Sequence, residues 1–130
     1  MNTGKLLPET LAAYLERAQP ILVEVARQGT VITYDELNDR LGGGPGRGYI
    51  GEVIGRVTEI EQEESRPKVS AVVVRSDTRM VGGGFFGFPD TPGAVRRSTP
   101  QEFQNPRLSH ADQEYWRVQL QEVYRYWREH

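Results

Sequence analysis

The chain has 130 residues, a formal net charge of −2 and no cysteine, so thiol nucleophiles, disulfides and cysteine-ligated metal sites are excluded. Its two histidines argue against a histidine-rich metal site. No apolar run reaches the length of a membrane span and no signal-peptide core begins the sequence. We therefore expect a single cytoplasmic domain over residues 1–130, without a membrane partner.

The charge balance alone does not indicate a nucleic-acid partner. Nearly all of the sixteen basic residues are arginine, the side chain best shaped for phosphate and base-edge contacts. A GC-rich genome would produce the same bias, so the composition leaves the partner open.

The first 29 residues favour helix. Pro8 suits a first helical turn, and apolar residues three and four apart predict a helix over Pro8–Gln19. Pro20 lacks an amide donor and crowds the preceding turn, so we expect either a kink or a new helix over Ile21–Arg27. Gly29 then provides a left-handed cap.

The stretch Thr30–Phe86 is the centre of the predicted fold. Thr33 and Glu36 have the spacing of a capping box, in which each side chain accepts the backbone N–H of the other residue. A short helix should therefore begin at Tyr34, and the glycine-proline run at residues 42–45 should end it.

A second helix is expected from about Gly48 or Tyr49 as the candidate recognition helix. Its apolar residues are spaced by three and four and should share one face: Ile50, Val53, Ile54, Val57 and Ile60. The carboxylates of Glu59–Glu64 end this helix and are interpreted as a solvated surface, although they oppose the helix dipole.

A wing is predicted after the two helices. Lys68–Arg75 is rich in β-branched residues and predicts a strand, Ser76–Arg79 predicts a turn, and Met80–Val81 begins a return strand. Two strands joined by a tight turn after a helix form a wing. The predicted fold class is therefore α+β, a winged helix-turn-helix with an N-terminal helical pair and a core over residues 29–87.

The C-terminal third contains a loop followed by a long helix. Residues 90–106 carry three prolines and predict loop, with one helical turn near Gln101–Phe103. Ser109 and Asp112 then predict a capped helix over about residues 109–128. Its aromatic face should pack on the domain or on a second copy, which makes a homodimer one possible assembly.

Two glycine-rich motifs have both functional and structural interpretations. Residues 46–51 match the dinucleotide pattern G-x-G-x-x-G, but no buried strand precedes them, so a nucleotide site is disfavoured. These glycines with Arg47 either present amide donors to a phosphate or simply allow a tight turn. Residues 82–87 either approach a sugar-phosphate backbone or anchor Phe85 and Phe86 in the core.

Catalysis has little support in the sequence. His110 stands at a predicted helix start without a partner motif, and the glutamates of residues 59–64 form one run where a metal site needs ligands from several elements. We expect no enzyme activity, no metal and no cofactor.

The span Gly29–Leu37 resembles the start of the helix-turn-helix in alkylguanine-DNA alkyltransferases and alkyltransferase-like proteins. There, a glycine, a β-branched pair and Thr-Tyr precede a short helix. Residues 49–51 are similar to the family's small-Val-Gly, and the resemblance continues through the later β-branched strand and glycine-rich stretch. It covers residues 29–87, about half of the chain.

The resemblance implies a winged helix that binds DNA and rotates a base out of the duplex. Tyr34 matches the family's tyrosine. The position of the family's arginine is occupied in this chain by Gly48, and Arg47 lies one residue earlier. The family's Pro-Cys-His-Arg site has no counterpart in Pro67–Arg75. The resemblance therefore implies the fold and DNA binding but no alkyl transfer.

The sequence thus predicts a non-catalytic DNA-binding protein related to DNA repair or regulation. The residues expected to meet DNA are Tyr34, Arg47, Gly48, Tyr49, Arg56, Arg75 and Arg79. Because Glu52 and the later glutamates repel phosphate, the alternative is a protein-interaction module that uses the acidic helix and the aromatic C-terminal helix.

Overall fold

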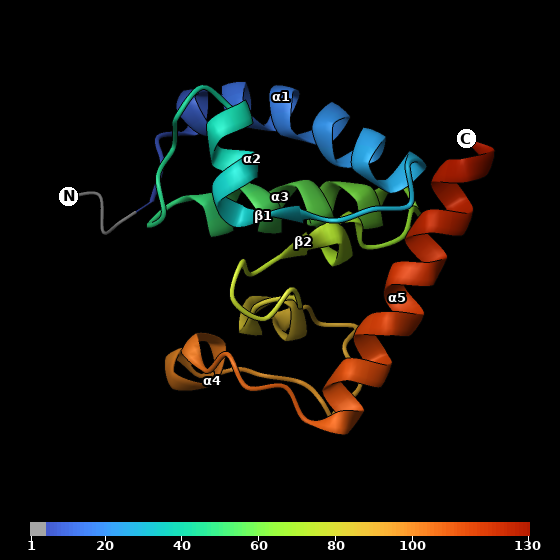
Figure 1. The fold of residues 1–130 in the computed structure, drawn as a ribbon. Coiled ribbons are helices and arrows are strands. Elements are labelled where there is room, and N and C mark those ends of the chain that lie inside the picture. The colour runs from blue at the N-terminus through green and yellow to red at the C-terminus, as the bar shows by residue number, and fades with distance from the viewer. Residues whose placement is uncertain (1–4) are drawn as a thin grey trace.

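A computed structural model describes residues 5–130 of the chain as a helix-rich α+β fold (Figure 1). The helices and strands are α1 (Pro8–Arg27), β1 (Ile32–Thr33), α2 (Tyr34–Arg40), α3 (Ile50–Glu63), β2 (Val73–Val74), α4 (Pro100–Gln104) and α5 (His110–Glu129). Two 3-10 helices, η1 (Val69–Val72) and η2 (Gly83–Gly87), lie on either side of the turn that follows β2.

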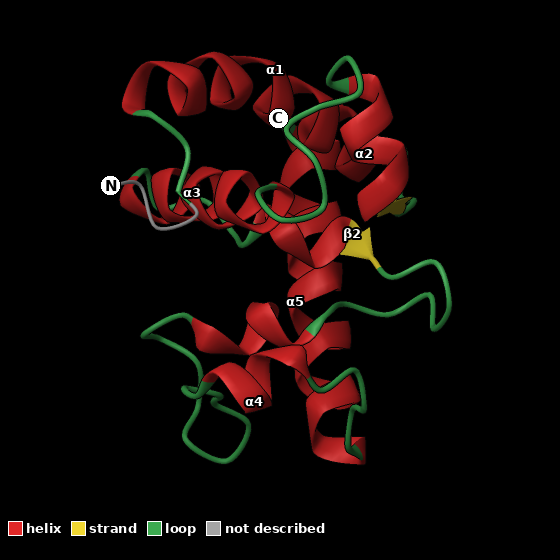
Figure 2. Cartoon of the chain, turned by 90° about the vertical axis from the view of Figure 1, so that its left-hand side faces the viewer, coloured by secondary structure: helices red, strands yellow, loops and turns green. Residues whose placement is uncertain are grey.

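The elements form two groups joined by α5. Helices α1 and α3 lie side by side with α2 near them, while η2 and α4 pack together in the other group (Figures 1 and 2). Helix α5 contacts both α1 and η1, which lies between the groups. This arrangement leaves the face of α3 opposite η2 to form a cleft.

Helix α1 runs without a break through Pro20, so a separate second helix at Ile21 was the wrong alternative. Pro20 is exposed, and the carbonyl of Glu16 that loses its amide donor belongs to an exposed residue. The helix ends at Arg27, and Gly29 provides the predicted left-handed cap with a φ of +66°. The amides of Gly29 and Thr30 bond the carbonyls of Ala26 and Val25, which is a Schellman motif.

The capping box that starts α2 is confirmed. The amide of Glu36 donates to the Thr33 hydroxyl at 3.1 Å, and the amide of Thr33 donates to the Glu36 carboxylate at 3.1 Å. These bonds hold the pKa of Glu36 below its ordinary value. Helix α3 buries its predicted apolar face, although Ile60 is only partly buried.

The interpretation of Glu59–Glu64 as a wholly solvated surface was wrong for Glu61. Its side chain is fully buried and accepts two hydrogen bonds from Arg66, at 2.7 and 2.9 Å. Ser65 has a left-handed φ of +58°, which turns the chain so that Arg66 folds back on the helix end. The glutamate-rich segment Glu59–Glu64 therefore contributes a buried carboxylate, Glu61, paired with Arg66, in addition to solvent-exposed carboxylates.

The predicted strand Lys68–Arg75 exists only at Val73–Val74, because the four preceding residues form η1. Strand β2 pairs in parallel with β1, in the register Ile32 with Val73 and Thr33 with Val74. Met80–Val81 is not a strand, and the amide of Arg75 bonds the carbonyl of Met80 at 2.9 Å across a turn. The expected two-stranded hairpin is therefore absent from residues 68–81.

Burial explains why most of the predicted strand Lys68–Arg75 does not form. All four η1 residues are buried against α1, α3 and α5, so the β-branched run reports a buried segment and does not specify a strand. Trp116 of α5 fixes this segment by donating from Nε1 to the carbonyl of Ala71 at 2.9 Å. The sheet is consequently reduced to two residues in each strand.

The C-terminal elements match the prediction closely. Helix α4 provides the expected turn, and α5 begins with a capping box between Ser109 and Asp112. Four apolar residues of α5 enter the core: Trp116, Leu120, Val123 and Trp127. Tyr115 and Tyr124 pack against the core while partly exposed.

Candidate functional site

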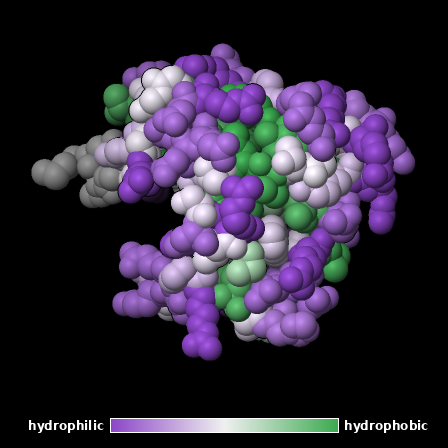
Figure 3. Space-filling model, in the orientation of Figure 1, coloured by the Kyte–Doolittle hydropathy of each residue, from purple (hydrophilic) through white to green (hydrophobic). Residues whose placement is uncertain are grey.

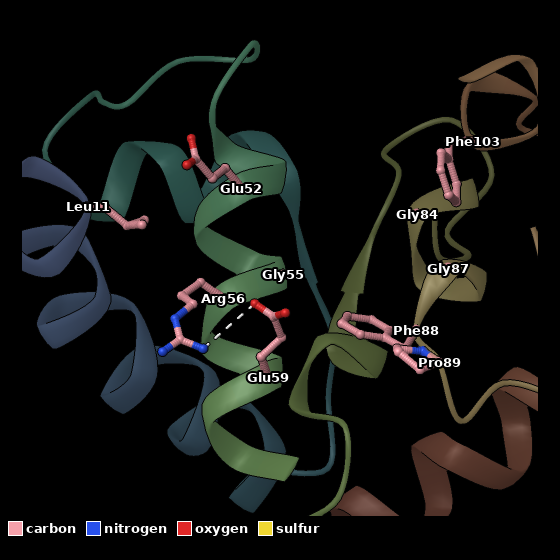
Figure 4. A pocket seen from close by; sticks show the side chains of 10 residues that line it. All are labelled: Leu11, Glu52, Gly55, Arg56, Glu59, Gly84, Gly87, Phe88, Pro89 and Phe103. Carbon is pink, nitrogen blue, oxygen red and sulfur yellow. Dashed lines mark ion pairs between the residues drawn. The ribbon is translucent and has the colours of Figure 1, made fainter. Parts of the chain in front are cut away.

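A cleft separates α3 from the segment of residues 82–106. It consists of three adjoining hollows that share Gly84: an arginine hollow of about 580 Å³, a floor hollow of about 90 Å³ and an outer groove of about 480 Å³. Figure 3 shows the molecular surface hollowed between the two groups of elements, and Figure 4 shows the outer groove from close by.

The arginine hollow is lined by five parts of the chain that are distant in sequence, one of which is the α4 region with Phe103, Gln104 and Pro106. Tyr34 comes from the start of α2, Arg47 from the turn before α3, Arg75 from the end of β2, and Gly82–Gly84 from the start of η2. Helix α3 contributes Ile50 and Gly51 of its first turn. The fold therefore brings three of the seven predicted DNA-binding side chains to one place.

Tyr34 joins α2 to η2 across this hollow. Its hydroxyl accepts the amide N–H of Gly82 at 3.3 Å, and burial raises the pKa of the hydroxyl. A Cβ on Gly82 would lie 2.9 Å from that hydroxyl, so the contact requires glycine. The tyrosine ring is partly buried and fixes the distance between the two sides of the cleft.

The two arginines of the hollow differ in exposure and in how they pair with carboxylates. The side chain of Arg47 is 89% exposed and pairs with Asp35 at 3.3 Å. Arg75 donates two hydrogen bonds to Asp77, at 2.9 and 2.7 Å, which raises the pKa of Arg75 and lowers that of Asp77. Arg47 is therefore the more accessible of the two cations, and its pair with Asp35 is weak because exposed ion pairs contribute little.

The other predicted site residues lie outside this hollow. Gly48 and Tyr49 are adjacent to Arg47 in the chain, and Tyr49 is the N-cap of α3. Arg56 lines the outer groove, where it pairs with Glu63 at 3.2 Å and Glu59 at 3.8 Å. Arg79 is exposed in the turn after β2, with a left-handed φ of +59°, and lines none of the three hollows. The arginines thus do not form one continuous positive face.

Ser70 lines the floor hollow and was not predicted as a site residue. Its hydroxyl oxygen is buried and has no hydrogen-bond partner within residues 5–130. Gly51 and Gly55, four apart on α3, line the same hollow beside Phe85 and Phe88. A buried hydroxyl without a partner is uncommon in folded proteins, so a polar atom of a ligand or water would be favoured beside Ser70.

Lys68 anchors the segment opposite α3. Its side chain is buried, and Nζ lies 2.6 Å from the Tyr115 hydroxyl and 2.8 Å from an Asp90 carboxylate oxygen. The rings of Phe85, Phe88 and Tyr115 surround the ammonium group at 5.3–5.8 Å. Asp90 also accepts a bond from Gln62 of α3, at 3.0 Å. Burial acts to raise the pKa of Asp90, but the bond and charge of Lys68 lower it overall.

Arg97 holds the outer end of the same segment. Its guanidinium donates to the carbonyls of Glu102, Asn105 and Arg107, at 2.6–2.8 Å, and pairs with Asp112 at 3.3 Å. It is nearly buried and lies over the ring of Phe86. These bonds position the α4 region, including Phe103, at the cleft.

The described part of the chain contains neither a metal-binding cluster nor a helix that could span a membrane. No three histidine or carboxylate side chains converge there as a metal site would require. None of the helices in residues 5–130 combines the length and apolar character needed to cross a bilayer. Comparisons with protein-family models, curated proteins and solved structures found no match.

Proposed function

We propose that the protein binds DNA without catalysing a reaction, and that α2, the turn before α3 and α3 act as a helix-turn-helix, with no β-hairpin wing in residues 68–81. One observation carries this proposal: Tyr34, Arg47, Arg75 and the backbone of Gly82–Gly84 meet at the start of α3. Repair or regulation is the corresponding cellular role.

Arg47 and Arg75 can contact a phosphate group in the arginine hollow if they exchange Asp35 and Asp77, the carboxylates that line the same hollow and pair with them. Arginine presents planar donors to phosphate oxygens, and the first turn of α3 adds the partial positive charge of a helix N-terminus. The glycine backbone of residues 82–84 permits close approach of a sugar-phosphate chain because Gly84 has no neighbour near its Cβ position. Binding would exchange the Arg47–Asp35 pair for a phosphate contact.

The acidic residues of α3 restrict where DNA can lie. Glu59 and Glu63 surround Arg56 at the far end of the helix, so that end repels phosphates. DNA would therefore contact the side of the first turn of α3 that carries Ile50 and Gly51, away from Glu52, and the turn after β2, where Arg75 and Arg79 lie. Arg56 makes no phosphate contact in this arrangement, which separates it from Arg47 and Arg75.

Binding of a labelled short duplex over a salt series tests the proposal. Arg47→Ala and Arg75→Ala should each weaken binding, and each should reduce the slope of log K against log salt by about one. Arg117→Ala is the matched control, since Arg117 is half-exposed on α5 and pairs only with residues of its own helix. Absence of binding at low salt, or an equal loss in the control, would refute DNA binding through this hollow.

A further inference from the structure

The outer groove differs in chemistry from the arginine hollow that adjoins it. Its α3 wall carries Glu52, Arg56 and Glu59, and its opposite wall carries apolar residues of the η2 and α4 regions (Figure 4). We propose that the outer groove docks a short, extended, basic peptide segment of a partner protein through one apolar side chain and flanking lysine or arginine residues. The proposal does not require DNA binding, and the outer groove shares Gly84 and Phe103 with the arginine hollow.

The residues that line the outer groove explain why the peptide needs an apolar side chain. Phe88 points toward α3, and Phe103 is 37% exposed although it is a large apolar side chain (Figure 4). Leu11 of α1 contributes a third apolar contact. A volume of about 480 Å³ lies within the range of small-ligand sites and fits one large side chain with adjacent backbone.

The backbone of an extended segment also has room to approach. A Cβ placed on Gly55 of α3 or on Gly84 of η2 would meet no atom within 4 Å, so both glycines leave open space on the groove side. Phe103 in turn packs against Gly87, where an added Cβ would lie 2.6 Å from its ring. Gly55 and Gly84 therefore leave the groove open, and Gly87 leaves room for the exposed ring of Phe103 to pack.

The charge of the α3 wall explains why the peptide needs lysine or arginine residues beside its apolar side chain. Arg56 is held between Glu59 and Glu63, so its charge is neutralised within α3. Glu52 forms no ion pair with another side chain of residues 5–130, and one of its oxygens accepts the backbone N–H of Leu6 at 2.9 Å. The groove wall is therefore net negative, which attracts a basic segment and repels a nucleic-acid backbone.

A selection from a random peptide display library, with the full chain as bait, tests the proposal. Enrichment of sequences with an aromatic or aliphatic residue flanked by lysine or arginine is expected. Synthetic copies of the enriched peptides are then measured by fluorescence anisotropy. Glu52→Gln and Glu59→Gln should each weaken binding by roughly 3–10-fold at low salt, and less at high salt.

Gly55→Leu is the decisive variant because it adds a large side chain to the wall of the groove. Leucine favours a helix over glycine by about 0.8 kcal/mol, and a Cβ at this position would meet no atom within 4 Å. It should reduce peptide binding at least tenfold while leaving the unfolding temperature unchanged or higher. Gly93→Leu is the matched control, since Gly93 is exposed outside the groove with no atom near its Cβ position.

Three results of the peptide measurements would overturn the proposal: no enrichment of basic-apolar sequences, enrichment of acidic ones, or equal binding by Gly55→Leu and the unaltered chain. The duplex measurement distinguishes the two proposals. Gly55→Leu is expected to keep DNA binding, whereas Arg47→Ala is expected to keep peptide binding. Loss of duplex binding in Gly55→Leu would instead make the outer groove part of a DNA site and refute the peptide.

Discussion

Arg66→Met tests the buried ion pair at the end of α3. In the structure, Arg66 donates two hydrogen bonds to Glu61, whose side chain has no exposure to solvent. Methionine keeps much of the volume of the arginine stem but donates no hydrogen bond. The substitution therefore leaves the carboxylate with only a 3.4 Å contact from Gln19.

The magnitude follows from the burial of the two partners. Breaking a fully buried ion pair costs about 3–5 kcal/mol. The side chain of Arg66 is 25% exposed, so water can partly replace it, and we expect a loss of about 2–4 kcal/mol in the free energy of unfolding. Replacing both residues, as Glu61→Leu with Arg66→Met, should recover most of that loss, because no buried charge then remains.

Urea unfolding followed by tryptophan fluorescence measures both variants. A loss of about 3 kcal/mol lowers the unfolding midpoint by roughly 1.5–2 M at a typical urea dependence for a small protein. The reasoning is refuted if Arg66→Met costs less than about 1 kcal/mol, or if the double variant is less stable than the single one.

Three further predictions concern stability. Ser65→Gly should raise the free energy of unfolding by about 0.5–1 kcal/mol in urea titrations, because Ser65 occupies the left-handed cap position that Gly29 fills after α1; a decrease would contradict this. Ser70→Ala should leave the free energy of unfolding unchanged or raise it by about 1 kcal/mol, since the Ser70 hydroxyl has no hydrogen-bond partner within residues 5–130. A loss above about 1 kcal/mol would show that the hydroxyl does make a hydrogen bond. The lowered pKa of Asp90 contributes stability above about pH 4 that is lost as pH falls through the folded pKa, so Asp90→Asn should flatten the acid limb of a stability–pH curve, and an unchanged limb would exclude the contribution.

The predictable part of the fold is the part specified locally. The capping residues Thr33 and Ser109 and the glycine cap at Gly29 act over three to six residues, and all three occur as predicted. The apolar face of α3 was likewise readable from its spacing. Such signals involve neighbours on one element, so the sequence alone contains them.

The parts that were not predicted depend on long-range partners. Lys68 is buried because Tyr115, 47 residues away, accepts its hydrogen bond, and nothing near Lys68 in the sequence indicates this. The strand prediction over residues 68–75 failed for a related reason, since a buried apolar run suits either a strand or η1 until its packing is known. Ser70 became notable only through its position at the floor hollow.

The candidate site combines both kinds of information. Tyr34, Arg47 and Arg75 were chosen from local motifs, and the fold brings them together from three segments. Arg56 was chosen by the same reasoning, but α3 turns it toward Glu59 and Glu63 in the outer groove. Helical spacing gives the relative directions of side chains on one helix, whereas the neighbour that each side chain meets depends on packing.

The most direct test of DNA binding at the arginine hollow is an NMR titration of the nitrogen-15-labelled protein with a short duplex at low salt. We predict that the largest amide shift changes occur in three segments, residues 47–51, 75–79 and 82–84, and that α5 is little affected. Changes confined to α5, or no changes at duplex concentrations that saturate the anisotropy signal, would contradict this prediction.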